Sequence, residues 1–196
     1  MNRNIVVIAG IETVRNKDGT VKKLSQTFMN NARTIESDLK DDNIVILDAR
    51  YFMNEPNPIE DLWGAVVAAF GDNLIDEIFY TGHSDPEGLY VFSRIRKELP
   101  EESRYLTAFF HWEAPLSETG CFRFNGCQTG GMDGVKFQNS LAQIVADKTR
   151  HIVWAYTTKS AQIRRPDGGY EQRPDKKGFV KFTPRTKSVD ISEKEL

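Results

Sequence analysis

The chain has 196 residues, of which 39% are hydrophobic and 11% aromatic, enough to bury the core of one domain. Its formal net charge of −2, with both signs interspersed, argues against a nucleic-acid-binding protein, which would carry a basic face. The longest apolar run, 65–70, is far shorter than the ~20 residues needed to span a bilayer. We therefore expect a single domain over residues 1–183 and a flexible charged tail over 184–196, with neither nucleic acid nor a membrane as partner.

The N-terminus and the two cysteines indicate the compartment. A run of only five apolar residues precedes Gly10, which is too short for the hydrophobic region of a secretory signal peptide. Two cysteines are too few for a disulfide scaffold, and Cys121 and Cys127 lie roughly 20 Å apart if their segment is extended. We expect a reduced protein in the cytoplasm, or one that is exported without a cleavable signal peptide.

Apolar periodicity in the first half of the chain predicts strands that alternate with helices. Continuous apolar runs predict buried strands over 4–9, 43–47 and 77–81. A polar loop over 12–20 follows the first strand, and apolar residues three and four apart then predict a helix from Val21 to Leu39. A second helix is expected between Asn57, which can cap it, and Gly71, which ends it.

The second half of the chain continues this alternation, although prolines interrupt the pattern between 85 and 120. A short strand over 89–92 and a helix over 101–112 are expected there. Further strands are predicted over 121–125, 151–156 and 178–183, and a helix that starts near Phe137 lies between the first two of them. The polar, basic stretch 160–177 predicts a long loop or a hairpin tip.

Strands alternating with helices indicate an α/β fold with a mostly parallel sheet of five or six strands and helices on both faces. Right-handed crossovers place the carboxyl ends of parallel strands at one edge of the sheet, where ligands and catalytic groups gather. His83 follows the predicted strand 77–81, and Cys127 follows the predicted strand 121–125. If these strands are neighbours, they lie about 4.8 Å apart, and the two side chains can face one crevice.

The pair of His83 and Cys127 predicts a cysteine endopeptidase, a thiol protease that hydrolyses a polypeptide substrate through a thioester intermediate. A cysteine attacks as its thiolate, and a nearby imidazole favours the thiolate and later protonates the leaving amine. Glycines on both sides of Cys127 let the backbone approach a substrate closely. The N–H groups of Cys127 and of a residue near His83 are candidates for an oxyanion hole. This chemistry requires no metal and no other cofactor.

The residues around both side chains resemble two motifs of the caspase-like superfamily of cysteine peptidases. Segment 80–84, Tyr-Thr-Gly-His-Ser, is similar to the strand-end motif aromatic-Ser-Gly-His-Gly, and segment 124–130, Phe-Asn-Gly-Cys-Gln-Thr-Gly, to a strand ending in Cys-x-[Ser/Thr]-Gly. The histidine precedes the cysteine by 44 residues, close to the separation of about 50 in caspases.

The resemblance covers roughly residues 4–157 and includes the order strand–helix–strand–helix–strand before the histidine. It is stronger to the bacterial metacaspase-like, clostripain-like, CHAT and autoprocessing toxin domains than to animal caspases. It implies a caspase-like sheet, a catalytic dyad of His83 and Cys127, and an oxyanion hole formed by the backbone N–H groups of Ser84 and Cys127.

Two positions depart from the family pattern. The family usually has glycine after the histidine, whereas Ser84 can still donate its N–H but adds a side chain at a crowded point. Many metacaspase-like relatives carry aspartate two residues before the cysteine, where it helps to select a basic substrate residue. Asn125 stands at that position, so the specificity for arginine or lysine does not carry over.

Three charged residues near the expected crevice are candidates for substrate binding. Arg15 lies in the loop after the first strand, and the resemblance implies that an arginine there binds an acidic substrate residue. Asp48 follows the second strand and Asp85 lies beside His83, so either could select arginine or lysine. Two acids against one arginine slightly favour a basic substrate residue, and exposed charges without a binding role are the alternative.

Other interpretations of these residues stay open. The domain could be a catalytically silent caspase-like module for interaction or regulation, which Ser84 in place of glycine favours. A serine esterase of α/β-hydrolase type would use Ser84 as its nucleophile, although Pro86 stands where its motif needs glycine. A zinc site would lack the short ligand spacing typical of such sites, its ligands being His83, His111, Cys121 and Cys127.

Overall fold

The computed structural model describes residues 2–15, 21–86, 88–92, 115–132, 135–174 and 179–185. The helix predicted over 101–112 and the tail from 186 onward lie outside these ranges. No helix within them is both long and apolar enough to cross a membrane.

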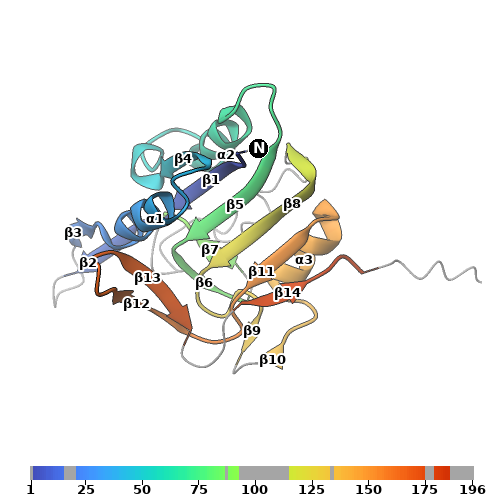
Figure 1. The fold of residues 1–196 in the computed structure, drawn as a ribbon. Coiled ribbons are helices and arrows are strands. Elements are labelled where there is room, and N and C mark those ends of the chain that lie inside the picture. The colour runs from blue at the N-terminus through green and yellow to red at the C-terminus, as the bar shows by residue number, and fades with distance from the viewer. Residues whose placement is uncertain are drawn as a thin grey trace, which may run out of the picture.

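Within the described residues, a six-stranded sheet forms the centre of the fold (Figure 1). Its strands in spatial order are β4 (Asn43–Asp48), β1 (Asn4–Ala9), β5 (Ile75–Thr81), β8 (Leu116–Asn125), β11 (Ile152–Ala155) and β14 (Val180–Phe182). The first five strands run parallel, and β14 pairs antiparallel with β11. The predicted α/β fold with a mostly parallel sheet is confirmed.

Helices cover both faces of this sheet, as predicted (Figure 1). Helices α2 (Pro58–Ala68) and α3 (Leu141–Thr149) share one core cluster with buried side chains such as Val6 and Phe122. Helix α1 (Thr27–Asp38) packs on the opposite face, where Ala32 belongs to a second cluster with Val7 and Phe79. Fully burying one such side chain contributes about 1.5–3 kcal/mol, so the two clusters fix the sheet between its helices.

Short two-stranded ladders flank the sheet in the described part of the chain. They pair β2 (Glu12–Arg15) with β3 (Val21–Ser25), β6 (His83–Asp85) with β7 (Gly88–Tyr90), β9 (Gly131–Met132) with β10 (Val135–Lys136), and β12 (Ser160–Arg164) with β13 (Tyr170–Pro174). A 3₁₀ helix, η1 (Ala49–Tyr51), follows β4. Residues 160–177 were expected to form a long loop or a hairpin tip, and the β12–β13 pair shows that strands occupy most of this stretch.

The segment 12–25 differs from its prediction. It contains the β2–β3 hairpin, so the predicted loop at 12–15 is a strand, and the helix begins at Thr27 rather than at Val21. Two apolar residues, Val21 and Leu24, are too few to establish a helical period, and pairing with β2 decides the local structure. The prediction of helix over 21–25 is wrong for this reason.

Other elements differ from their predictions at their ends. The helix predicted to start near Phe137 begins at Leu141, because the hydroxyl of Ser140 caps it by accepting a hydrogen bond from the N–H of Gln143 at 3.4 Å. Phe137 lies outside this helix and is exposed. Asn57 occupies the N-cap position of α2 as predicted, but its side chain makes no capping hydrogen bond.

Candidate active site

The register between β5 and β8 brings His83 and Cys127 to corresponding positions. Thr81 of β5 pairs with Asn125 of β8, and each of the two candidate residues lies two positions beyond that pair. The strands are parallel neighbours, so both residues leave the sheet at the same edge, about 4.8 Å apart in strand spacing. The predicted adjacency of the two strand ends is confirmed, while the catalytic roles of His83 and Cys127 stay predictions.

His83 is held between the end of β5 and helix α1. Its ring packs edge-on against the ring of Phe28, with centroids 4.9 Å apart and an interplanar angle of 88°. Its carbonyl oxygen accepts a hydrogen bond from the hydroxyl of Tyr80 at 2.7 Å. Position 82 must be glycine for this contact, because a Cβ on Gly82 would lie 2.1 Å from that hydroxyl. Burial raises the pKa of Tyr80 well above its ordinary value, so the hydroxyl remains a donor.

Cys127 lies in the turn after β8 and contacts the first residue of β12. The N–H of Ser160 donates to Sγ of Cys127 at 3.4 Å, and this thiol donates to the Ser160 carbonyl oxygen, also at 3.4 Å. Gln128 follows with φ of 54°, which few residues other than glycine adopt, and its N–H donates to the carbonyl oxygen of Thr158 at 3.0 Å. The segment after β11 therefore fixes both the side chain of Cys127 and the turn that carries it.

The hydroxyl of Ser84 joins β6 to the turn after β8. It donates to the carbonyl oxygen of Cys127 at 2.9 Å and lies 3.1 Å from the hydroxyl of Thr129. Gly126 makes room for it, since a Cβ at that position would lie 1.9 Å from Oγ of Ser84. The side chain of Ser84 is thus accommodated, and it holds the backbone of the candidate nucleophile.

Buried polar side chains lie at the ends of β5 and β8. Asn31 of α1 donates to the hydroxyl of Thr81 at 2.6 Å. Asn125 is 8% exposed, and its Oδ1 is buried without a hydrogen-bond partner among the described residues, as is the hydroxyl oxygen of Thr158. Buried polar atoms are normally hydrogen-bonded, so these two oxygens are exceptions close in the chain or in space to the turn of Cys127 and Gln128.

The acidic candidates for substrate binding both have partners close in the sequence. Asp48 is buried at the end of β4, where it caps η1 and pairs with Arg50, accepting hydrogen bonds from its N–H at 3.0 Å and its Nε at 2.9 Å. Asp85 accepts hydrogen bonds from the N–H of Gly88 at 3.0 Å and from the hydroxyl of Tyr90. Both carboxylates therefore stabilise local turns, and their role in substrate binding stays a prediction.

Two further predictions receive no direct test. Arg15 belongs to β2, but its side chain lies outside the part that the structure describes. The backbone of Ser84 pairs with Leu89 in the β6–β7 ladder. Cys127 lies in the turn that follows β8. The assignment of their N–H groups to an oxyanion hole stays a prediction.

Cys121 has surroundings that differ from those of Cys127. It lies within β8, where its thiol donates to Glu77 at 3.6 Å, and burial raises the pKa of this thiol to about 11. At neutral pH it is protonated and a poor nucleophile. His111 lies outside the described residues, and no three His, Cys, Asp or Glu side chains within them group in a way that could hold a metal ion.

Sequence reasoning missed Phe28, Tyr80 and Ser160 as neighbours of the two candidate residues. Ser160 is 33 residues from Cys127 and opens a stretch without apolar periodicity, so no pattern indicated the contact. Tyr80 was visible only as part of an apolar strand.

No protein-family model and no curated protein matches this chain.

Proposed function

We propose that this protein is a caspase-like cysteine endopeptidase, with Cys127 as nucleophile and His83 as general base. The observation that carries the proposal is the register of β5 and β8, which brings both residues to one sheet edge. The order β1, α1, β4, α2, β5 before His83, with the β2–β3 hairpin before α1, supports the family resemblance.

The proposed reaction has two stages. Sγ of Cys127 attacks the carbonyl carbon of the scissile peptide bond, its proton passes to His83, and the N–H groups of Ser84 and Cys127 stabilise the oxyanion. His83 then protonates the leaving nitrogen, the C–N bond breaks, and a thioester remains. Water attacks the thioester while His83 accepts its proton, and that proton returns to sulfur when the carboxylic acid product leaves.

The contacts of Ser84 bear on the alternatives. Its side chain fits against Gly126 and binds the Cys127 carbonyl, so its presence is no argument for a catalytically silent module. A serine esterase needs an exposed nucleophilic hydroxyl, whereas Ser84 is 9% exposed and its hydroxyl is already engaged. The geometry therefore favours Cys127 as the nucleophile.

The proposed substrate is a polypeptide, and the proposed compartment is the cytoplasm. Both cysteines are free, which fits a reducing environment. A preference for a basic substrate residue stays a prediction, because Asp48 and Asp85 each bind a neighbour already.

Labelling with a peptidyl acyloxymethyl ketone tests this function. We expect a mass increase at Cys127 in the wild type and none in Cys127→Ala, with Cys121→Ser as the control that retains labelling. Absence of labelling in a folded wild-type protein would favour the silent module, and phosphonofluoridate labelling of Ser84 would favour the esterase.

Peptide hydrolysis gives a second test of the dyad. Cys127→Ala and His83→Ala should each abolish turnover of a peptide library, and the double variant should resemble either single variant, because the two groups act as one unit. Substantial turnover by Cys127→Ala would refute the nucleophile assignment.

A further inference from the structure

Ser160 places three polar atoms around the sulfur of Cys127. Its N–H lies 3.4 Å from Sγ, its carbonyl oxygen also lies 3.4 Å away, and its hydroxyl oxygen lies 3.5 Å away. A thiol can donate to the carbonyl, but a thiolate can only accept hydrogen bonds. The N–H and the hydroxyl of Ser160 can both donate to a thiolate at this place, and hydrogen bonds to an ionised group are the stronger kind.

The β12–β13 hairpin that carries Ser160 is docked on helix α1. The side-chain amide of Gln162 donates to the carbonyl oxygen of Thr27, next to the Phe28 ring that packs on His83. At the other end of the hairpin, the N–H of Tyr170 donates to the hydroxyl of Thr34 at 2.8 Å.

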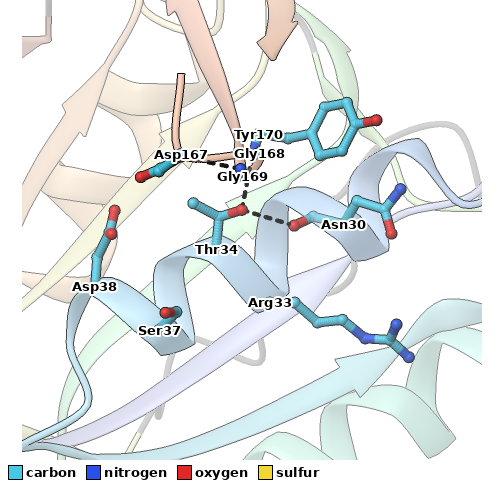
Figure 2. A pocket seen from close by; sticks show the side chains of 9 residues that line it. All are labelled: Asn30, Arg33, Thr34, Ser37, Asp38, Asp167, Gly168, Gly169 and Tyr170. Atoms are coloured by element: carbon cyan, nitrogen blue, oxygen red, sulfur yellow. Dashed lines mark hydrogen bonds between the residues drawn. The ribbon is translucent and has the colours of Figure 1, made fainter. Parts of the chain in front are cut away.

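An ion pair adds to this docking near the hairpin turn, where Arg165 binds Asp38 of α1. Figure 2 shows Thr34, Asp38 and Tyr170 around the hollow between α1 and this turn. Ser160 and Gln162 lie two residues apart on β12 and are both half-buried, whereas Ala161 between them is exposed. The strand face that docks on α1 is therefore the face that contacts the sulfur.

We propose that Ser160 is a positioning residue that stabilises the thiolate of Cys127, and that docking of the β12–β13 hairpin on α1 regulates this contact. A docked hairpin presents the N–H and hydroxyl of Ser160 to the sulfur. A displaced hairpin withdraws both donors and leaves a less reactive thiol. The inference rests on the proposed function only in giving this thiolate the role of nucleophile.

The titratable groups beside Cys127 lie on β5, at the start of β6 and just before β12. His83 lies at the end of the neighbouring strand, and Tyr80 interacts electrostatically with Cys127 from β5. Lys159, which precedes Ser160, is exposed. Variants at Ser160 leave all three in place, so a change in the ionisation of Cys127 reports on the Ser160 donors.

The test measures the rate of Cys127 alkylation by iodoacetamide against pH, with the labelled residue identified by mass spectrometry. In Ser160→Ala we expect the pH of half-maximal rate to rise by about one unit, because the thiolate loses one donor. Ser160→Thr, which keeps the hydroxyl, should stay close to the wild type. An unchanged half-maximal pH in Ser160→Ala would overturn the proposal.

A remote variant tests the docking step. Thr34→Val combined with Asp38→Asn removes the contacts of Tyr170 and Arg165 with α1, at the end of the hairpin opposite Ser160. We expect the half-maximal pH of Cys127 alkylation to rise in this variant too. If it stays at the wild-type value while Ser160→Ala shifts, regulation by docking is refuted. Labelling of Cys121 serves as an internal control, because a variant that unfolds would expose this partly buried thiol further.

Iodoacetamide reacts with the thiolate of Cys127 whether or not the protein is a peptidase. The proposed peptidase function and the proposed Ser160 contact can therefore fail separately. A shift in Ser160→Ala together with no labelling by the peptidyl ketone would refute the peptidase and support the Ser160 contact. Normal peptidyl labelling with no shift would refute the Ser160 contact and support the peptidase.

Discussion

At the scale of single residues, Ser84 shows how a side chain fits into a crowded place beside Cys127. Its hydroxyl occupies space that Gly126 leaves open and binds the carbonyl of Cys127. Ser84→Ala removes the hydrogen bond and keeps the backbone N–H. We expect the free energy of unfolding, measured by urea titration, to fall by about 1 kcal/mol.

The activity of a second variant distinguishes two roles of the Ser84 side chain: it either positions Cys127 or obstructs the proposed active site. In Ser84→Gly, the backbone of the proposed nucleophile Cys127 loses its hydrogen bond from Ser84, so kcat/KM on a cleaved peptide should fall. A large gain in kcat/KM, such as tenfold, would instead mean that the serine side chain obstructs the site and that the hydroxyl has no positioning role.

The two cysteines differ in environment, which predicts selective alkylation. Burial raises the pKa of Cys121 to about 11 from an ordinary value of 9.0, so its thiolate is scarce at pH 8. We expect labelling of Cys121 to be about 100-fold slower than that of an unperturbed cysteine at this pH. Mass spectrometry of peptides from the labelled protein measures this rate, and equal labelling of both cysteines in the folded protein would contradict the assignment.

The same shift predicts how alkaline pH affects stability. The folded-state pKa of Cys121 lies above its unfolded value, so the unfolded state ionises first as the pH rises. The free energy of unfolding should therefore decline between about pH 9 and pH 11, and Cys121→Ser should reduce that decline. Urea titrations of both proteins across this range measure the difference.

At the scale of elements, the parts of the fold predicted correctly are those with continuous apolar runs. β1 and β5 bury almost every side chain, and such runs indicate a parallel sheet with both faces covered. That His83 and Cys127 leave the sheet at one edge was predictable, because parallel strands share one carboxyl edge. The hairpin over 12–25 was not, because its pairing depends on contacts between strands rather than on a local period.

The neighbours of the candidate site could not be predicted for a related reason. Phe28 reaches His83 only because α1 packs across the sheet, and Ser160 reaches Cys127 only because the β12–β13 hairpin folds back. Sequence patterns report burial and local period, whereas these contacts arise from the packing of whole elements.

Tyr80 links the body of β5 to the start of β6, where His83 lies. Tyr80→Phe removes the hydrogen bond to the His83 carbonyl and leaves the ring in place. We expect the free energy of unfolding to fall by about 1–2 kcal/mol and peptide turnover to fall, because His83 loses a backbone restraint. Tyr51→Phe is the matched control, since Tyr51 is 79% exposed and its change should alter neither quantity. Equal effects of the two variants would show that the Tyr80 hydroxyl does not position the loop.

At the scale of the whole molecule, one buried carboxylate connects three neighbouring strands of the sheet. Glu77 of β5 is buried and binds Arg123 of β8, and it accepts a hydrogen bond from Arg3, just before β1, at 3.1 Å. Arg3 continues the network to Asp42 at 2.6 Å, just before β4. The guanidinium of Arg123 also lies within 6 Å of three aromatic ring centroids, those of Phe79 at 5.6 Å, Trp154 at 5.8 Å and Phe179 at 5.9 Å.

Removing one member of this network should destabilise the sheet more than removing a surface pair. Arg123→Gln leaves the buried carboxylate of Glu77 with Arg3 as its charged partner, and we expect a loss of about 2–3 kcal/mol in the free energy of unfolding. Glu77→Gln combined with Arg123→Gln removes both charges and should recover part of that loss. The control is Arg185→Gln, which breaks a more exposed ion pair with Asp147 and should cost less than about 1 kcal/mol. If urea titration gives the same loss for Arg123→Gln and Arg185→Gln, the Glu77 network does not hold the strands together, and hydrophobic packing alone accounts for the stability of the sheet.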